Sequence, residues 1–212
     1  MSEICHDLHF LFNRLPAHRF PFDGNQIPRN GIYVIFEAGE TAHGTNRIVR
    51  IGTHTGADQL HSRLQQHFVK ENKDRSIFRK NIGRAILNRD HDPFLTDWEV
   101  DLATKDAKLH YSSLIDSARQ KQIEQEVSKY IQANLSFAVI PVDSKDERLT
   151  LESKFISTVS LCEECRPSHS WLGQYSPKEK IRESGLWLVN ELYKQGLSTS
   201  EYEAFEKTIT TR

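Results

Sequence analysis

The chain has 212 residues and a formal net charge of −1, from 28 Lys and Arg against 29 Asp and Glu. Apolar residues make up 37% of it, which is enough to build a core at this length. No segment approaches the roughly 18 consecutive apolar residues of a membrane helix, and MSEICHDLHF lacks the basic start and apolar run of a signal peptide. We therefore expect a cytoplasmic globular protein without a membrane partner.

The three cysteines are an odd set that cannot all pair within the chain, which favours a reducing compartment. Cys162 and Cys165 have the spacing of half a zinc site, and His169 is nearby. Further ligands would have to come from the N-terminal segment, where the candidates are Cys5, His6 and His9. Ordinary reduced thiols are the simpler interpretation.

The first half of the chain predicts two strands between helices. Apolar spacing indicates a helix over 3–14, ended by Pro16. Residues 31–37 (GIYVIFE) are typical of a strand, and 47–52 (RIVRIG) of its antiparallel return, with a long turn-like loop over 38–46. Helical stripes follow over 60–68 and 77–87.

The second half predicts one more strand and several helices. In chain order these are a charged helix over 119–134, a strand over 136–142, a helix over about 146–161, a helix that begins at the capping box Ser176–Glu179, and a last helix over about 199–209. With no repeat and no convincing linker, a single α+β domain with helical additions is the simplest architecture.

The charge is unevenly distributed along the chain. Residues 47–91 hold ten basic against four acidic residues, an excess of six, whereas the remainder holds 18 basic against 25 acidic, a deficit of seven. A basic segment of this kind is typical of an anion-binding face, and it is also compatible with solvated basic helices.

A phenol, two guanidinium groups, an imidazole and a carboxylate stand at informative positions. Tyr33 and Arg50 lie on neighbouring predicted strands, and Arg63 and His67 are four residues apart on one helical face. Glu152 falls within an apolar helical stripe, where a carboxylate is costly unless it is paired, hydrogen-bonded or bound to a metal. A structural arginine partner is the simplest explanation for Glu152 alone, but few structural needs explain the whole set.

This ordered series resembles the GIY-YIG nuclease family. The resemblance rests on GIY at 31–33, RIG in place of YIG at 50–52, RLQQH at 63–67, and the Glu152 helix after a third strand. The segments VRIGTHTG, SIFRKNIGRAIL, PSHSWLGQYSP and SGLWLVN also look like a bacterial subgroup of that family.

The resemblance implies a small antiparallel three-stranded sheet flanked by helices. We accordingly divide the chain into an N-terminal helix and loop over 1–30, a nuclease-like core over 31–162, and a C-terminal helical extension packed on the core over 163–212. The implied chemistry is metal-dependent hydrolysis of DNA phosphodiester bonds, with DNA as the partner and a second copy of this chain as a further candidate partner.

Roles for individual residues follow from the same resemblance. Glu152 would bind one divalent ion, Mg²⁺ or Mn²⁺, Tyr33 would be the general base, and Arg63 would clamp the phosphate. His67 would hydrogen-bond Tyr33 or a phosphate oxygen. Arg50 stands where the family usually has a second tyrosine, and a cation there can still contact phosphate.

Five further residues are secondary candidates for binding phosphate or DNA. Asn190 is one candidate for the family's asparagine, although a structural helix role fits it as well. The basic helices between 58 and 89 would approach the DNA backbone. The secondary candidates are His54, Arg79, Lys80, Arg84 and Asn190. The alternative to an endonuclease is a catalytically inactive nucleic-acid-binding or structural module of the same fold.

Overall fold

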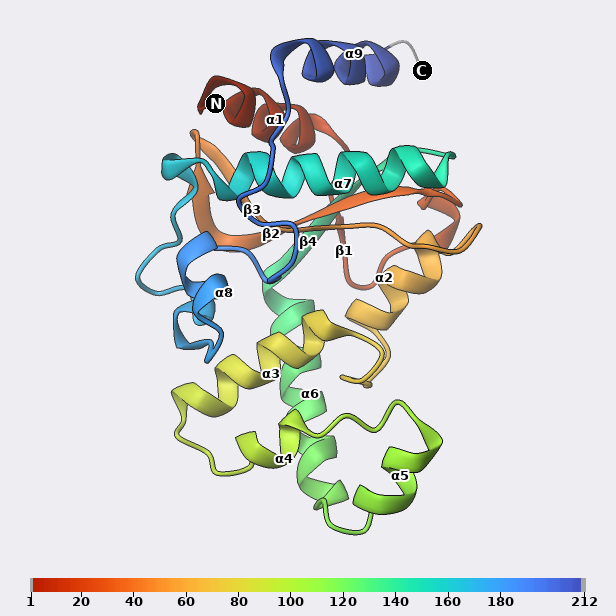
Figure 1. Cartoon of the computed structure of the whole chain (residues 1–212), viewed down its shortest axis with the longest axis vertical. Helices are drawn as coiled ribbons and strands as arrows, with labels where there is room; N and C mark the ends of the chain where they lie inside the picture. Colours follow the sequence, from red (N-terminus) through yellow and green to blue (C-terminus); the bar gives the residue numbers. More distant parts are fainter. Residues whose placement is uncertain (1, 211–212) are drawn as a thin grey trace.

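The computed structural model describes residues 2–210 and shows a small antiparallel sheet with helices on both faces (Figure 1). The strands are β1 (His18–Arg19), β2 (Gly31–Ala42), β3 (Thr45–Gly52) and β4 (Leu135–Pro141), in the order β1-β4-β2-β3. The α+β fold is therefore confirmed. The very short β1, which sequence periodicity cannot detect, makes the sheet four-stranded.

The long loop predicted over 38–46 is wrong, because β2 and β3 continue through it to a tight turn. Ala42 pairs with Thr45, so only His43 and Gly44 connect the strands, and both have positive φ, 52° and 71°. This is the backbone that a short hairpin turn requires. The register shift between Phe36 and Thr41 places extra residues in β2, which hid the strand pattern in the sequence.

One face of the sheet is covered by α1 (Ser2–Arg14), α7 (Lys145–Ser160) and α9 (Thr199–Thr210), which lie together in Figure 1. Ile32 and Val34 of β2 point to this side and pack with Phe12 and Phe155 in its core. Side chains alternate across a strand, so their neighbours Tyr33 and Ile35 point to the opposite face.

The opposite face is covered by α2 (Leu60–Phe68), α3 (Ile77–Arg89) and α6 (Ser117–Asn134). The short helices α4 (Leu95–Glu99) and α5 (Lys105–Tyr111) lie at the far end of the molecule (Figure 1). Helix α3 is buried continuously from Phe78 to Leu87. It is therefore a central helix rather than a solvated basic one.

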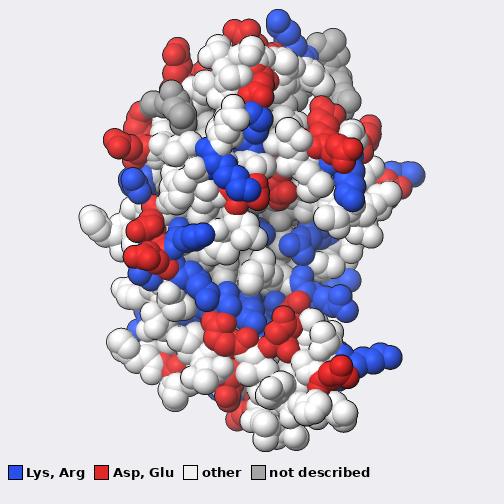
Figure 2. All heavy atoms as spheres, viewed as in Figure 1, with Lys and Arg blue, Asp and Glu red and all other residues white. Residues whose placement is uncertain are grey.

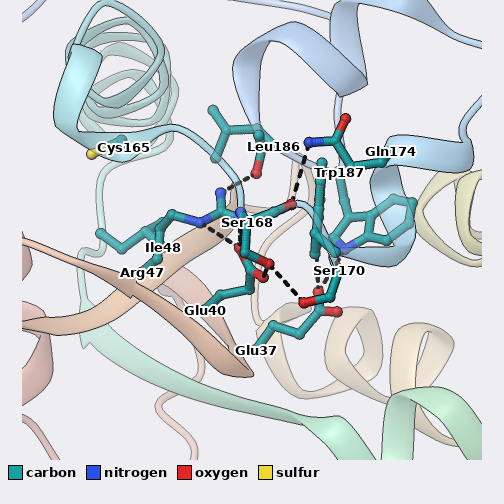
Figure 3. Close-up of polar contacts among 12 residues, drawn as sticks. Glu37, Glu40, Arg47, Ile48, Cys165, Ser168, Ser170, Gln174, Leu186 and Trp187 are labelled. Carbon is teal, nitrogen blue, oxygen red and sulfur yellow. Dashed lines mark hydrogen bonds and ion pairs between the residues drawn. The ribbon is translucent and has the colours of Figure 1, made fainter.

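The C-terminal segment packs against the β2–β3 hairpin through a buried polar network (Figure 3). Arg47 donates to Glu40 from Nε at 3.0 Å and to the carbonyl oxygen of Gly185 at 2.5 Å. Glu40 also accepts the backbone N–H of Ser168 at 3.1 Å. Removal of one partner of a buried ion pair is strongly destabilising. We therefore expect this network to hold the C-terminal segment against the hairpin.

This segment holds short helices, η2 (Glu163–Cys165), η3 (Leu172–Tyr175) and α8 (Glu179–Ser184), while η1 (Gly24–Gln26) precedes β2. Helix α8 begins three residues later than predicted, because the Ser176 hydroxyl accepts from Lys178 N within a turn before the helix. Within residues 2–210, no helix combines the length and the apolar character needed to span a bilayer.

Candidate active site

A pocket of about 480 Å³ lies beside β3, an edge strand of the sheet. Because β3 is at the edge, helices from both faces reach the same place: α7 from one side, α2 and α3 from the other. The backbone N–H of Trp187 donates to Val49 of β3 at 2.7 Å, so the C-terminal segment closes the rest of the edge. The polar residues that line the pocket are Arg50, Arg63, Asn81, Glu152, Asn190 and Glu191.

Glu152 reaches the pocket from α7, whose first turn is capped by Ser144. Its Oε1 accepts the backbone N–H of Thr53 at 3.0 Å, which ties the carboxylate to the end of β3. Burial raises the pKa of Glu152, and the positive charge of Arg50 and the Thr53 hydrogen bond oppose that rise. The cost of burying this carboxylate in an apolar stripe is therefore reduced, because it accepts a backbone N–H and lies near two arginines.

Arg50 is 6% exposed and held from two directions. One terminal nitrogen donates to the carbonyl oxygen of Trp187 at 2.6 Å, and the guanidinium lies 5.0 Å from the centre of the Phe78 ring. Within the described residues, its Nε has no hydrogen-bond partner although it is buried. A buried donor without a partner is costly, so this nitrogen is suited to an oxygen supplied from the pocket.

Asn81 is a second buried donor of this kind. Its Oδ1 accepts from Arg84 at 2.6 Å, which orients the amide, and its Nδ2 has no partner among the residues described. Asn81 lies on α3 and lines the same pocket as Arg50. Two residues of the pocket lining, Arg50 and Asn81, therefore each carry a buried N–H donor without a partner among the residues described, and with Arg63 they suit an anionic ligand.

Tyr33 and His67 form a buried pair below the pocket, and neither is exposed. The Tyr33 hydroxyl lies 2.7 Å from His67 Nε2, and His67 Nδ1 lies 2.7 Å from the hydroxyl of Ser76. Burial, followed by nearby arginine charges led by Arg63, holds the pKa of His67 well below its ordinary value. A neutral imidazole has one donor and one acceptor nitrogen, so it can link the two hydroxyls.

The two arginines connect this pair to the carboxylate. Arg50 and Arg63 lower the pKa of both His67 and Glu152 through their charges, and thus lie within electrostatic range of each. Arg63 is partly exposed, lines the pocket, and donates to Gln66 at 3.1 Å. The structure therefore brings the five primary candidates into one cluster, with Tyr33 and His67 beneath the pocket wall rather than in it.

Steric constraints explain why glycine stands at two motif positions. A Cβ on Gly31 would lie 2.1 Å from the carbonyl oxygen of Ile140 on β4. A Cβ on Gly52 would lie 2.2 Å from the Tyr33 hydroxyl. Only glycine allows β2 and β4 to approach at the first position and the phenol to cross β3 at the second.

Of the secondary candidates, Asn190 is brought to the pocket and His54 lies beside it. His54 donates from Nδ1 to the carbonyl oxygen of Gly56 at 2.7 Å and accepts from the Gly31 N–H at 3.3 Å, so both of its ring nitrogens are used by backbone. Burial lowers the pKa of His54. Its contacts hold the loop after β3 against β2.

Arg79, Lys80 and Arg84, which we expected to contact phosphate or DNA, are buried in α3 and bind groups within the protein. Arg79 is fully buried and pairs with Glu124 at 2.7 Å. Arg84 pairs with Glu99 at 2.5 Å, and Lys80 donates to the Glu99 carbonyl oxygen at 2.8 Å. Their charges are already satisfied within the protein, so we leave them out of the proposed DNA interface below.

Sequence reasoning missed Asn81, Ser76 and the backbone carbonyl of Trp187. Asn81 directly follows Arg79 and Lys80. Those two residues stand out in the sequence by their positive charge, whereas the neutral Asn81 is the one that lines the pocket. Ser76 carries a recognisable N-cap signal, since its hydroxyl accepts from Arg79 N at 3.3 Å, but the link to His67 is tertiary. A backbone carbonyl leaves no signal in the sequence.

Comparison with known proteins agrees with this geometry. A family model described as the GIY-YIG domain matches residues 20–212, which includes strands β2, β3 and β4, the pocket helices and the C-terminal segment. No curated protein and no solved structure matches the chain. The match spans well over half of the chain, and the chain belongs to the GIY-YIG nuclease superfamily.

Proposed function

We propose that this protein is a metal-dependent endonuclease that hydrolyses DNA phosphodiester bonds in the pocket beside β3. The observation that carries the proposal is that Arg50, Arg63 and Glu152, from three separate elements, line one pocket next to the buried Tyr33–His67 pair. Phosphodiester hydrolysis needs cations on the phosphate, a carboxylate for a metal and a path for a proton. This cluster supplies the residue types for each.

The donor set at Glu152 fits a hard divalent cation. Oε1 is occupied by the Thr53 N–H, whereas Oε2 has no hydrogen-bond partner within residues 2–210 and remains available as a ligand. Glu191 and Asn190 add oxygen donors to the same pocket. Mg²⁺ is commonly held by one or two carboxylates together with substrate phosphate, and Mn²⁺ accepts the same ligands. Such an ion, when bound, lowers the pKa of water and stabilises the leaving oxygen.

Side chains of the protein would bind the phosphate and transfer the proton. Arg63 would hold the scissile phosphate by its two-pronged geometry, and Arg50 would supply Nε to a second phosphate oxygen. Tyr33 would accept the proton of the attacking water while it passes its own phenol proton to Nε2 of neutral His67, which lies 2.7 Å away. The Ser76 hydroxyl fixes the imidazole on its other side.

Exposed cations next to the pocket support a DNA approach from this side. Lys and Arg side chains form an interrupted band across the middle of the face in Figure 2, where α2 and α3 lie in Figure 1. Lys70 and Arg75, which follow α2, are exposed to solvent. Together with the partly exposed Arg63, they would contact the DNA backbone on either side of the scissile phosphate.

A catalytically inactive nucleic-acid-binding module is the second candidate, and one observation favours it. Tyr33 has no exposed surface and does not line the pocket, and an arginine occupies the position of the second motif tyrosine. A general base has to contact the water that it deprotonates, so a fully buried phenol favours binding without cleavage. This candidate predicts salt-sensitive DNA binding without cleavage.

The decisive experiment is nicking of supercoiled plasmid with Mg²⁺ or Mn²⁺ by the wild-type chain, Glu152→Gln and Glu147→Gln. Glu147 is an exposed glutamate on the same helix and outside the pocket, so it controls for the loss of a charge. We expect cleavage by wild type and Glu147→Gln, and loss on the order of 10²-fold or more in Glu152→Gln. DNA binding without cleavage by the wild type would support the inactive module. Equal cleavage by all three proteins would remove Glu152 from the mechanism.

A further inference from the structure

A cluster of thiol and imidazole groups lies away from the pocket, and it shares no residue with the pocket lining. It joins segments far apart in the chain: Cys5 from α1, His43 from the β2–β3 turn, and Cys162 and Cys165 from the segment after α7. All three cysteines are buried and none forms a disulfide. The exposed residues His6 and His169, which sequence spacing offered as recruits, are not part of it.

Three distances between the ligand atoms match those of a tetrahedral zinc site. Cys5 Sγ lies 3.4 Å from Cys165 Sγ, and His43 Nε2 lies 3.5 Å from Cys165 Sγ and 3.4 Å from Cys162 Sγ. Zinc bonds of about 2.3 Å to sulfur and about 2.0 Å to nitrogen place neighbouring ligand atoms roughly 3.3–3.8 Å apart.

His43 is the most informative member of the cluster. It occupies the tip of a hairpin, with φ of 52°, a position where a side chain ordinarily projects into solvent. Its side chain is nevertheless only 1% exposed and turns inward to the thiols. The other ring nitrogen, Nδ1, lies 3.3 Å from the Glu164 carboxylate. A carboxylate on the far nitrogen is the usual partner of a metal-binding histidine.

His9 is also close, and its ring atoms lie within 4.8 Å of the ligand atoms of Cys5, His43 and Cys165. Both of its nitrogens are already used by backbone, however. Nδ1 lies 2.9 Å from the Cys5 carbonyl oxygen, and Nε2 accepts the N–H of Ile48 at 3.2 Å. A nitrogen that accepts a hydrogen bond cannot bind a metal with the same lone pair, so His9 connects α1 to β3 and supports the site from outside.

We propose that Cys5, His43, Cys162 and Cys165 bind one structural Zn²⁺. Three thiolates and one imidazole are a known structural zinc set, and their protons are released to solvent as the ion binds. The set is closed, with four protein ligands and no position for substrate, so the ion has no part in the proposed cleavage reaction. The proposal does not depend on nuclease activity.

The consequence of this site is mechanical. The ion joins α1, the tip of the β2–β3 hairpin and the end of α7, and it adds to the hydrogen bonds that His9 and Asn13 of α1 make with β3. Helix α7 carries Glu152, and β3 leads to Arg50. A zinc ion at this place would therefore stabilise the framework that holds both pocket residues without touching either.

The test begins with metal analysis of the full-length wild-type chain, purified without chelator. We expect about one zinc per chain after gel filtration. Zinc removed by a chelator under reducing conditions should make the three thiols reactive and lower the melting temperature, and added Zn²⁺ should reverse both. Reconstitution with Co²⁺ should give the intense visible bands of tetrahedral thiolate coordination. These measurements use the wild type, so they stand even if a ligand variant fails to fold.

Two pairs of variants then identify the ligands. His43→Ala and Cys162→Ser should lower zinc affinity by at least about tenfold, while the matched controls His169→Ala and His9→Gln should retain the wild-type metal content. Glutamine can still accept from Ile48 N–H, which keeps the structural role of His9. Zinc loss in His9→Gln with retention in Cys162→Ser would overturn the ligand assignment. A wild-type chain without zinc that also gives no cobalt bands would overturn the site.

Discussion

Arg50 of β3 donates a 2.6 Å hydrogen bond to the carbonyl oxygen of Trp187, 137 residues further along the chain. The contact unites the two halves of the pocket, since the residues directly after Trp187 form its outer wall. Trp187 is itself held by a hydrogen bond from its indole N–H to Glu37 at 2.9 Å. The C-terminal segment thus sets the position of the arginine that replaces the motif tyrosine.

Arg50→Lys should separate charge from geometry at this position. A lysine can donate to the Trp187 carbonyl oxygen, but it lacks the Nε that we propose contacts phosphate. We expect plasmid cleavage to fall on the order of 10²-fold with DNA affinity within a few fold of wild type. Arg89→Lys, on the exposed end of α3, is the matched control and should cleave normally. Unchanged cleavage by Arg50→Lys would show that its role is structural.

Tyr33→Phe removes one hydroxyl from a site with no exposure. If the phenol takes the proton of the attacking water, the cleavage rate should fall about 10²–10⁴-fold while DNA binding persists. Because His67 Nε2 loses its partner, the free energy of unfolding should also fall by about 1–3 kcal/mol. Tyr175→Phe, at an exposed position, controls for the substitution. A Tyr33→Phe enzyme as fast as wild type would exclude the base role.

Acid should destabilise the protein through His67, whose pKa is held well below its ordinary value by burial. Below about pH 6.5 the unfolded chain protonates this histidine while the folded protein does not, so the unfolded state binds more protons. The contribution of neutral His67 is therefore complete above about pH 6.5 and is lost as pH falls, by up to about 1.4 kcal/mol per pH unit. Denaturant melts across this range give the slope.

The slope should be shallower in His67→Gln than in wild type, whatever the absolute stability of the variant. His54, whose pKa is also lowered by burial, contributes in the same direction and leaves a residual slope. The exposed His110→Gln variant should keep the wild-type slope. Identical slopes for all three proteins would mean that His67 is protonated alike in the folded and unfolded states.

The basic segment should divide into two functional groups. Lys70→Ala and Arg75→Ala alter exposed cations, and each should weaken DNA binding and reduce the salt-dependence slope by about one without changing the melting temperature. Arg79→Met leaves Glu124 as a buried unpaired carboxylate and should cost about 3–5 kcal/mol of stability. Equal effects of Arg75→Ala and Arg79→Met on the melting temperature would contradict this division.

Gly52→Ala tests the close approach between β3 and the phenol. The new Cβ would meet the Tyr33 hydroxyl at 2.2 Å and its ring at 2.4 Å, so the ring must move. We expect a loss of about 1–3 kcal/mol in stability and disruption of the Tyr33–His67 hydrogen bond, with cleavage lost as a result. Gly44→Ala provides the contrast, because nothing lies within 4 Å of a Cβ there and its cost is confined to a positive φ.

Much of the fold was predictable because it rests on local patterns. The helices α2 and α6, the paired strands β2 and β3, and β4 follow from apolar periodicity and turn residues, and the structure bears them out. The hairpin turn at His43–Gly44 was missed because the extra residues in β2 break the alternation on which strand prediction depends. The short elements β1, α4 and α5 carry too few residues for any periodic signal.

By itself, the sequence determined the family motifs, the order of the main elements and the residue types that phosphodiester chemistry requires. Only the tertiary structure decided which charged side chains are free. Arg79 and Arg84 have the same charge as Arg63, yet they are paired with Glu124 and Glu99, and pairing depends on contacts between distant helices. For the same reason, nothing in the sequence indicates that His43 contacts the cysteines, because 119 residues separate it from Cys162 along the chain.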